Sequence, residues 1–133
     1  MRQQDDDIKP FSPSARAKHR AAEDLGRRAE EDVAALLCRQ GYEVLARRLR
    51  TGAGEIDLVV ANDVRLVFVE VKARATITEA SYAILPRQQA RLLRAATVAL
   101  AGHAAWARPE TRFDVALVAS GEIKIIENAI WLD

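Results

Sequence analysis

The segment Val67–Lys72 combines a strand pattern with two charges that a buried strand tolerates poorly. It reads VFVEVK, and such a nearly continuous apolar run is typical of a strand covered on both faces of a sheet. Glu70 and Lys72 are two residues apart, so their side chains lie on the same face. Burying each charge costs several kcal/mol unless a partner compensates it. We therefore expect a specific partner for these two charges.

The segment Glu55–Val60 (EIDLVV) shows the same conflict one strand earlier, with Glu55 and Asp57 on one face. Between the two segments, Asn62-Asp63 suits a tight hairpin turn. If these two residues form the turn, Ala61 pairs with Val64 and the register of the whole hairpin follows. A three-residue loop would shift this register by one and send Asp57 to the opposite face.

In the two-residue register, Glu55 lies opposite Glu70, and Asp57 lies opposite Phe68. Four charged side chains then converge on one face of the hairpin: Glu55, Asp57, Glu70 and Lys72. Carboxylates that face each other across a ladder repel. A divalent cation bound between them removes this repulsion.

Oxygen ligands from two or three carboxylates suit Mg²⁺ (or Mn²⁺), which keeps several waters and also accepts phosphate oxygens. Bound to Asp57, Glu70 and Glu55, such an ion acidifies a water and polarises a phosphate. Lys72 beside it helps to deprotonate that water or neutralises charge on the phosphate. The pattern favours metal-assisted phosphodiester hydrolysis. The alternative is a cross-strand salt-bridge cluster in which Lys72 is shared among the acids.

The rest of the chain predicts two helices and three further strands. Apolar residues spaced three and four apart predict a helix from Ser14 to Gly41, and Pro86 begins a second helix that runs to about Ala101. Strands are expected at 42–49, 55–61, 64–73, 113–119 and 122–126, with a flexible link at 51–54 and a loop at 74–85. This order predicts an α/β protein with a mixed β-sheet flanked by helices, in the order α-β-β-β-α-β-β.

Residues 1–13 contain three consecutive aspartates and two prolines without apolar periodicity, which is typical of a disordered arm. Residues 14–133 are then expected to form a single domain. The N-terminus lacks the apolar core of a secretory signal, and no apolar run approaches the roughly 20 residues of a membrane-spanning helix. The one cysteine, Cys38, has no partner for an internal disulfide. We therefore expect a cytoplasmic protein with no membrane partner.

The two charged strand segments closely resemble the YraN-like family of small uncharacterised bacterial proteins. The matching motifs, in order, are Gly26–Glu30, Gly41-Tyr42, Gly54–Val59 (GEIDLV), Val67–Arg74 (VFVEVKAR) and Arg112–Val115. The resemblance covers roughly residues 20–131. Its central part is similar to the motif of the PD-(D/E)XK superfamily of restriction-endonuclease-like nucleases, with Asp57 as the first acid and Glu70-Val71-Lys72 as the (D/E)XK element.

This resemblance implies a restriction-endonuclease-like core. It also implies that Asp57 and Glu70 are metal ligands and that Lys72 is the catalytic lysine. Related nucleases use a helix glutamate as an additional metal or water ligand, and Glu30 matches that position. The alternative for Glu30 is an ordinary charge on a helix surface.

Arginine accounts for sixteen of the twenty basic residues. Its planar fork binds phosphate in bidentate fashion, although codon bias would also enrich it. Three arginines of the second predicted helix are spaced four and three apart and so share one face, as in any amphipathic helix. The candidate contacts to nucleic-acid phosphates are Arg48, Arg50, Arg74, Arg87, Arg91 and Arg94.

The sequence therefore predicts a Mg²⁺-dependent nuclease, an endonuclease or exonuclease, acting on branched or duplex DNA or on RNA. An alternative is a nuclease-like scaffold that binds nucleic acid or a protein partner without cleavage. A third hypothesis is that these charges form a purely structural cluster. The sequence leaves open whether the protein forms a homodimer.

Overall fold

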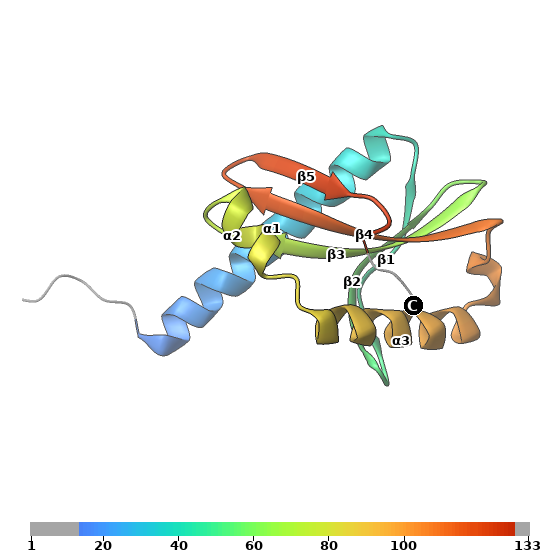
Figure 1. The fold of residues 1–133 in the computed structure, drawn as a ribbon, viewed down its shortest axis with the longest axis horizontal. Coiled ribbons are helices and arrows are strands. Elements are labelled where there is room, and N and C mark those ends of the chain that lie inside the picture. The colour runs from blue at the N-terminus through green and yellow to red at the C-terminus, as the bar shows by residue number, and fades with distance from the viewer. Residues whose placement is uncertain (1–13, 130–133) are drawn as a thin grey trace, which may run out of the picture.

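Residues 14–129, which the computed structural model describes, follow the predicted order of elements with a short helix added (Figure 1). The predicted arm at 1–13 lies outside the described residues. No helix among those described is long and apolar enough to cross a membrane. The elements are α1 (Ala15–Arg39), β1 (Glu43–Thr51), β2 (Gly54–Ala61), β3 (Arg65–Ala73), α2 (Ile77–Tyr82), α3 (Pro86–Gly102), the 3₁₀ helix η2 (Ala104–Trp106), β4 (Glu110–Ala119) and β5 (Glu122–Ile126).

The five strands form one sheet in the order β1-β2-β3-β4-β5. All neighbouring pairs are antiparallel except β3 and β4, which run parallel. A parallel pair needs a long crossover connection, and here the chain makes it through α2 and α3. The prediction of a mixed sheet flanked by helices is confirmed.

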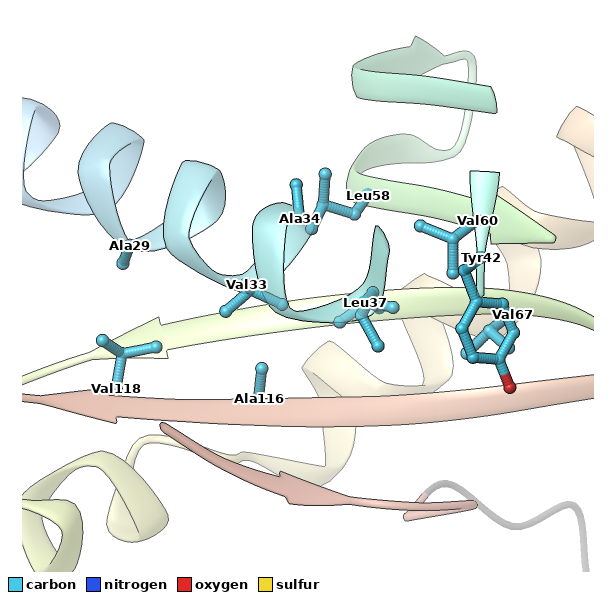
Figure 2. Packing of buried hydrophobic residues seen from close by; sticks show 11 residues of the cluster. Ala29, Val33, Ala34, Leu37, Tyr42, Leu58, Val60, Val67, Ala116 and Val118 are labelled. Atoms are coloured by element: carbon cyan, nitrogen blue, oxygen red, sulfur yellow. The ribbon is translucent and has the colours of Figure 1, made fainter. Parts of the chain in front are cut away.

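Helix α1 covers one face of the sheet. Its buried residues Ala29, Val33 and Leu37 pack on Val67 of β3 and Ala116 of β4, among others, in a cluster that we call the α1-side core (Figure 2). Burial of this apolar surface holds the second half of α1 against the sheet.

Helices α3 and α2 cover the opposite face. Leu92 and Ala96 of α3 pack on Val59 of β2 and Phe68 of β3, in a cluster that we call the α3-side core. The short α2 packs through Ala80 onto β4. Strands β2 and β3 are therefore buried on both faces, as their nearly continuous apolar sequences predict.

The turn between β2 and β3 lies one residue later than the sequence suggested. The N–H of Asn62 donates to the carbonyl of Arg65, so Asp63 and Val64 form the connection, and not Asn62-Asp63. The side chain of Asn62 accepts hydrogen bonds from the N–H groups of both Val64 and Arg65. Asparagine at the first position of a turn stabilises it in this way, and this explains the displacement.

This displacement changes which residues face each other across the hairpin. Val59 pairs with Phe68, and Leu58 pairs with Val69. The predictions that Asp57 lies opposite Phe68 and Glu55 opposite Glu70 are therefore wrong, and continuing the observed register places Asp57 opposite Glu70. Because the register moves by an even number of residues, this shift by itself moves no side chain to the other face of the sheet.

Two segments predicted to be irregular are ordered. The expected flexible link at 51–54 is a tight turn, in which the Thr51 hydroxyl donates to the carbonyl of Gly54 and accepts from the N–H of Ala53. The expected loop at 74–85 contains α2, which begins after Thr76 because its side chain accepts from the N–H of Glu79. The six-residue length of α2 gives too little periodicity to predict it from sequence.

Candidate functional site

Strand β2 changes its orientation at Asp57. Ile56 belongs to the α3-side core and Leu58 to the α1-side core, although strict alternation would put residues 56 and 58 on one face. On β1, Arg48 lies between two residues that pair with Leu58 and Ile56, and its φ is +48°. A positive φ is uncommon outside glycine, and such strain concentrates at functional sites.

The carboxylate of Asp57 lies in an environment that disfavours its charge. Burial, together with the negative charge of Glu70, raises the pKa of Asp57 from 3.8 to about 7. Its Oδ2 accepts one hydrogen bond, at 2.8 Å, from the N–H of Val71 on β3. That bond and the nearby Lys72 lower the pKa, but they do not offset burial and repulsion.

Glu70 and Lys72 extend from β3 on the same side, two residues apart. The Nζ of Lys72 lies 3.2 Å from Oε1 of Glu70, and both side chains are less than one-fifth exposed. The positive charge of Lys72 compensates part of the negative charge of the carboxylates. The lysine is thereby held beside the two carboxylates.

Glu30 reaches the site from α1, one residue beyond the buried Ala29. Burial raises the pKa of Glu30, and the charges of Glu55 and Glu70 raise it further, while Arg48 lowers it. The Nε of Arg48 lies 3.5 Å from the Glu30 carboxylate. Glu30 thus interacts electrostatically with Glu55 and Glu70, and Asp57 interacts with Glu70, Glu30 and Lys72. The prediction that Glu55 shares a face with Glu70 and Lys72 is wrong, because Glu55 precedes Ile56 of the α3-side core whereas Glu70 and Lys72 flank Val71 of the α1-side core.

The carboxylate oxygens of the site are ligands of the kind that a hard divalent cation prefers. Asp57 and Glu70 supply carboxylate oxygens and repel each other, so a cation between them lowers their energy. Within residues 14–129 no group of three His, Cys, Asp or Glu side chains is arranged to enclose an ion. Mg²⁺ commonly binds through one or two carboxylates and completes its shell with water and substrate phosphate. Asp57 and Glu70 lie just beyond the last paired residues of β2 and β3, and two carboxylates are enough for a site of this kind.

Arginines border these carboxylates on the β1 side. Arg50 lies 3.7 Å from Glu55, with its guanidinium largely in solvent. Arg27 of α1, which is not among the predicted phosphate contacts, lines a cleft of about 420 Å³ together with Glu23, Arg48, Arg50 and Glu55. Its position three residues before Glu30, on the same helix face, is a signal from which it was predictable.

The other predicted arginines occupy three different places. Arg91 of α3 lies against Gly54 at the start of β2. Arg74 lies at the end of β3 in a separate groove beside Ala22, Leu25 and Gly26 of α1. Arg87 and Arg94 are exposed on α3, and the contacts of the described residues do not join them to the carboxylates.

Gly54 fits its position for two reasons. Its φ of +140° is a conformation that side chains rarely adopt, and a Cβ there would lie 3.0 Å from Cδ of Arg91. We expect Gly54→Ala to destabilise the protein by about 2 kcal/mol through backbone strain and displacement of Arg91. Urea unfolding measures this, with Gly52→Ala in the same turn as the control. A Cβ at Gly52 meets nothing within 4 Å, so equal effects in both variants would contradict the argument.

Asp114 of β4 is a buried carboxylate that belongs to a different environment. Arg112 donates two hydrogen bonds to it, at 2.8 and 2.9 Å, and the N–H of Asn128 donates a third. Its charge is satisfied within the protein, so it lacks the conflict seen at Asp57. This carboxylate holds the segment after β5 against β4.

Together, the fold and the site define an α/β protein with a mixed five-stranded sheet and a half-buried carboxylate–lysine cluster where β2 begins and β3 ends. The chain belongs to the uncharacterised protein family UPF0102, whose sequence model matches residues 29–118. The family membership expected from the motifs is thereby confirmed.

Relatives with the same family name cover most of the chain. A UPF0102 protein of Acidiphilium cryptum is 50% identical over 117 residues, which is 88% of this chain and 91% of the relative. A UPF0102 protein of Rhodopseudomonas palustris is 50% identical over 99 residues, covering 74% of this chain and 76% of the relative. One of Granulibacter bethesdensis is 44% identical over 109 residues, covering 81% and 69% respectively.

Proposed function

We propose that this protein is a metal-dependent nuclease with a restriction-endonuclease-like core, hydrolysing phosphodiester bonds in nucleic acid. The observation that carries the proposal is the environment of Asp57. A carboxylate whose pKa is raised to about 7 by burial and by a second carboxylate is costly for folding. Groups shifted by burial and by a specific charged neighbour are concentrated at functional sites, and Glu70 and Lys72 are the charged neighbours of Asp57.

Mg²⁺ or Mn²⁺ held by Asp57 and Glu70 would supply a water of lowered pKa and a polarised phosphate. Glu55 lies near enough to Glu30 to influence its charge, so both acids are placed to orient the remaining waters. Lys72, held as an ammonium at Glu70, would stabilise the negative charge that grows on the phosphate oxygens. Water, losing its proton to solvent, forms a bond to phosphorus as the ester P–O bond breaks, and the leaving oxygen takes up a proton from solvent.

Arginines on two sides of the carboxylates suit the backbone of a nucleic acid. Arg48 and Arg50 lie at 3.5 and 3.7 Å from their acidic partners, longer than the usual separation in a strong ion pair. Their guanidinium groups are therefore available for exchange to phosphate. Arg91 of α3 lies against Gly54 at the start of β2. This distribution favours contact with the phosphate backbone and not with the bases.

The test is a Glu70→Ala variant, measured by calorimetric titration with Mg²⁺ and Mn²⁺ and by cleavage of branched DNA, duplex DNA and RNA. We expect the variant to lose metal binding and to cleave about 10³-fold more slowly, because several kcal/mol of transition-state stabilisation are lost. Glu43→Ala is the matched control, since Glu43 is an exposed acid at the start of β1.

Two results would contradict the proposal. Absence of metal binding at millimolar concentration, even with nucleic acid present, would remove the catalytic centre. Metal binding without cleavage of any of these polymers would instead favour the non-catalytic scaffold that binds nucleic acid or a protein partner.

A further inference from the structure

The first turns of α1 extend beyond the sheet. From Ser14 to Arg28 almost every residue is exposed, and the first buried residue of the helix is Ala29. Figure 1 shows these first turns, in blue, running past the sheet and α2 into solvent. An isolated helix of this length is marginal in water, so an extension of this kind gains stability when a partner binds it.

The charge of this extension differs from that of the remaining chain. Residues 14–28 contain five basic and two acidic residues, whereas all other residues together contain fifteen basic and seventeen acidic. The positive charge is therefore concentrated on the exposed first half of α1. A polyanion is the partner that this charge fits.

Three of the five basic residues share one face of the helix, on which the acid Glu23 also lies, paired with His19 at 2.7 Å. Arg16, Arg20 and Arg27 are spaced four and seven apart, which places them in one line along α1. The same line continues to Glu30, three residues beyond Arg27. Arg27 also borders the cleft formed with Arg48 and Arg50. The line of arginines thus leads directly to the proposed catalytic carboxylates.

We propose that Arg16, Arg20 and Arg27 form a phosphate-binding track that holds the nucleic-acid strand as it leaves the Asp57–Glu70 site. The proposal rests on the proposed function and specifies its substrate class. From Arg16 to Glu30 the helix rises about 21 Å, which equals about six nucleotides of a strand at 3.4 Å each. The substrate is therefore a polymer that extends about six nucleotides from the bond that is cleaved. Di- and trinucleotides would not reach the end of the track.

The test compares two double variants that remove the same charge from different faces of the helix. Arg16→Gln with Arg20→Gln alters the track, and Lys18→Gln with Arg28→Gln alters the other side of the same segment. All four side chains are exposed, and glutamine preserves helix propensity. Binding to a 20-base-pair duplex is measured by fluorescence anisotropy in EDTA, across a range of salt concentrations.

We expect the track variant to bind about 30-fold more weakly at 0.15 M salt. Its slope of log affinity against log salt should fall by about 2, since each lost phosphate contact removes about 0.9. The control pair should retain most of the slope. With a trinucleotide, both variants should match the wild type. An equal loss of affinity for the duplex in both variants, or no loss in either, would contradict the proposed track.

The alternative partner for the exposed helix is a second copy of this chain. If sedimentation shows that the track variant dissociates a dimer while nucleic-acid binding is unchanged, the track is overturned. The proposed function is tested separately, through metal binding and cleavage by Glu70→Ala. A track variant with weakened binding, in a protein that does not cleave, would contradict the nuclease while supporting the track.

Discussion

Replacing Asp114 by alanine is expected to destabilise the protein by about 3 to 5 kcal/mol. Asp114 is fully buried on β4, where its carboxylate accepts two hydrogen bonds from Arg112 and one from the N–H of Asn128. Alanine would leave a mostly buried guanidinium and a backbone N–H without their acceptor. The cost of those unpaired groups exceeds the loss of any one hydrogen bond.

Urea unfolding monitored by circular dichroism measures this loss. Asp114→Asn is a useful intermediate, because an amide oxygen can still accept from Asn128 but cannot neutralise Arg112. Asp32→Ala on the exposed side of α1 serves as the control and should change the free energy of unfolding by less than about 0.5 kcal/mol. A loss below about 1 kcal/mol for Asp114→Ala would show that the interior around Arg112 admits water and does not depend on this pair.

Asp114 also shows what the sequence could not distinguish. Arg112 and Asp114 are two residues apart on a strand, as are Glu70 and Lys72, so both pairs share a face by the same rule. The two pairs differ in their surroundings. Asn128 reaches Asp114 only after the chain has formed β5 and turned back, whereas Glu70 lies near the carboxylate of Asp57. Contacts between segments distant in the sequence determine which carboxylate has all its hydrogen-bond partners. The spacing of residues along one strand does not predict those contacts.

The hairpin of β2 and β3 shows two different errors of prediction. The turn is predicted at Asn62-Asp63 and forms at Asp63-Val64, because Asn62 uses its side chain to cap the turn. Every facing pair changes, but a shift of two residues does not by itself exchange the faces of the sheet. The change of orientation at Asp57 does move Glu55 to the face opposite to Glu70 and Lys72, and strict alternation along β2 gives no sign of it.

Replacing Asp57 by asparagine is expected to stabilise the protein, whereas replacing Asp114 by alanine destabilises it. Because the pKa of Asp57 rises from 3.8 in the unfolded chain to about 7 in the fold, the folded state holds this proton more tightly. The stabilisation from that proton is complete below about pH 4 and is lost as pH rises through 7. At pH 8 the full cost of the buried charge is present. The raised pKa of Glu30 acts in the same direction.

In EDTA at pH 8, Asp57→Asn should therefore be more stable than the wild type by about 2 kcal/mol. The rise in pKa corresponds to about 4 kcal/mol, and relaxation around the site reduces what the variant gains. The amide oxygen can still accept the hydrogen bond from the N–H of Val71. At pH 5 the difference should be smaller, because much of the wild-type carboxyl is then protonated. Urea unfolding at both pH values gives the comparison.

Magnesium ions should reverse this order. Millimolar Mg²⁺ binds the folded wild type through Asp57 and Glu70 and raises its free energy of unfolding, whereas the variant lacks one of the two ligands and gains little. A purely structural charge cluster requires the contrary: Asp57→Asn would then lower stability in EDTA, and Mg²⁺ would have the same effect on both proteins. The sign of one stability difference, measured with and without Mg²⁺, thus separates a carboxylate kept for metal binding from one kept for folding.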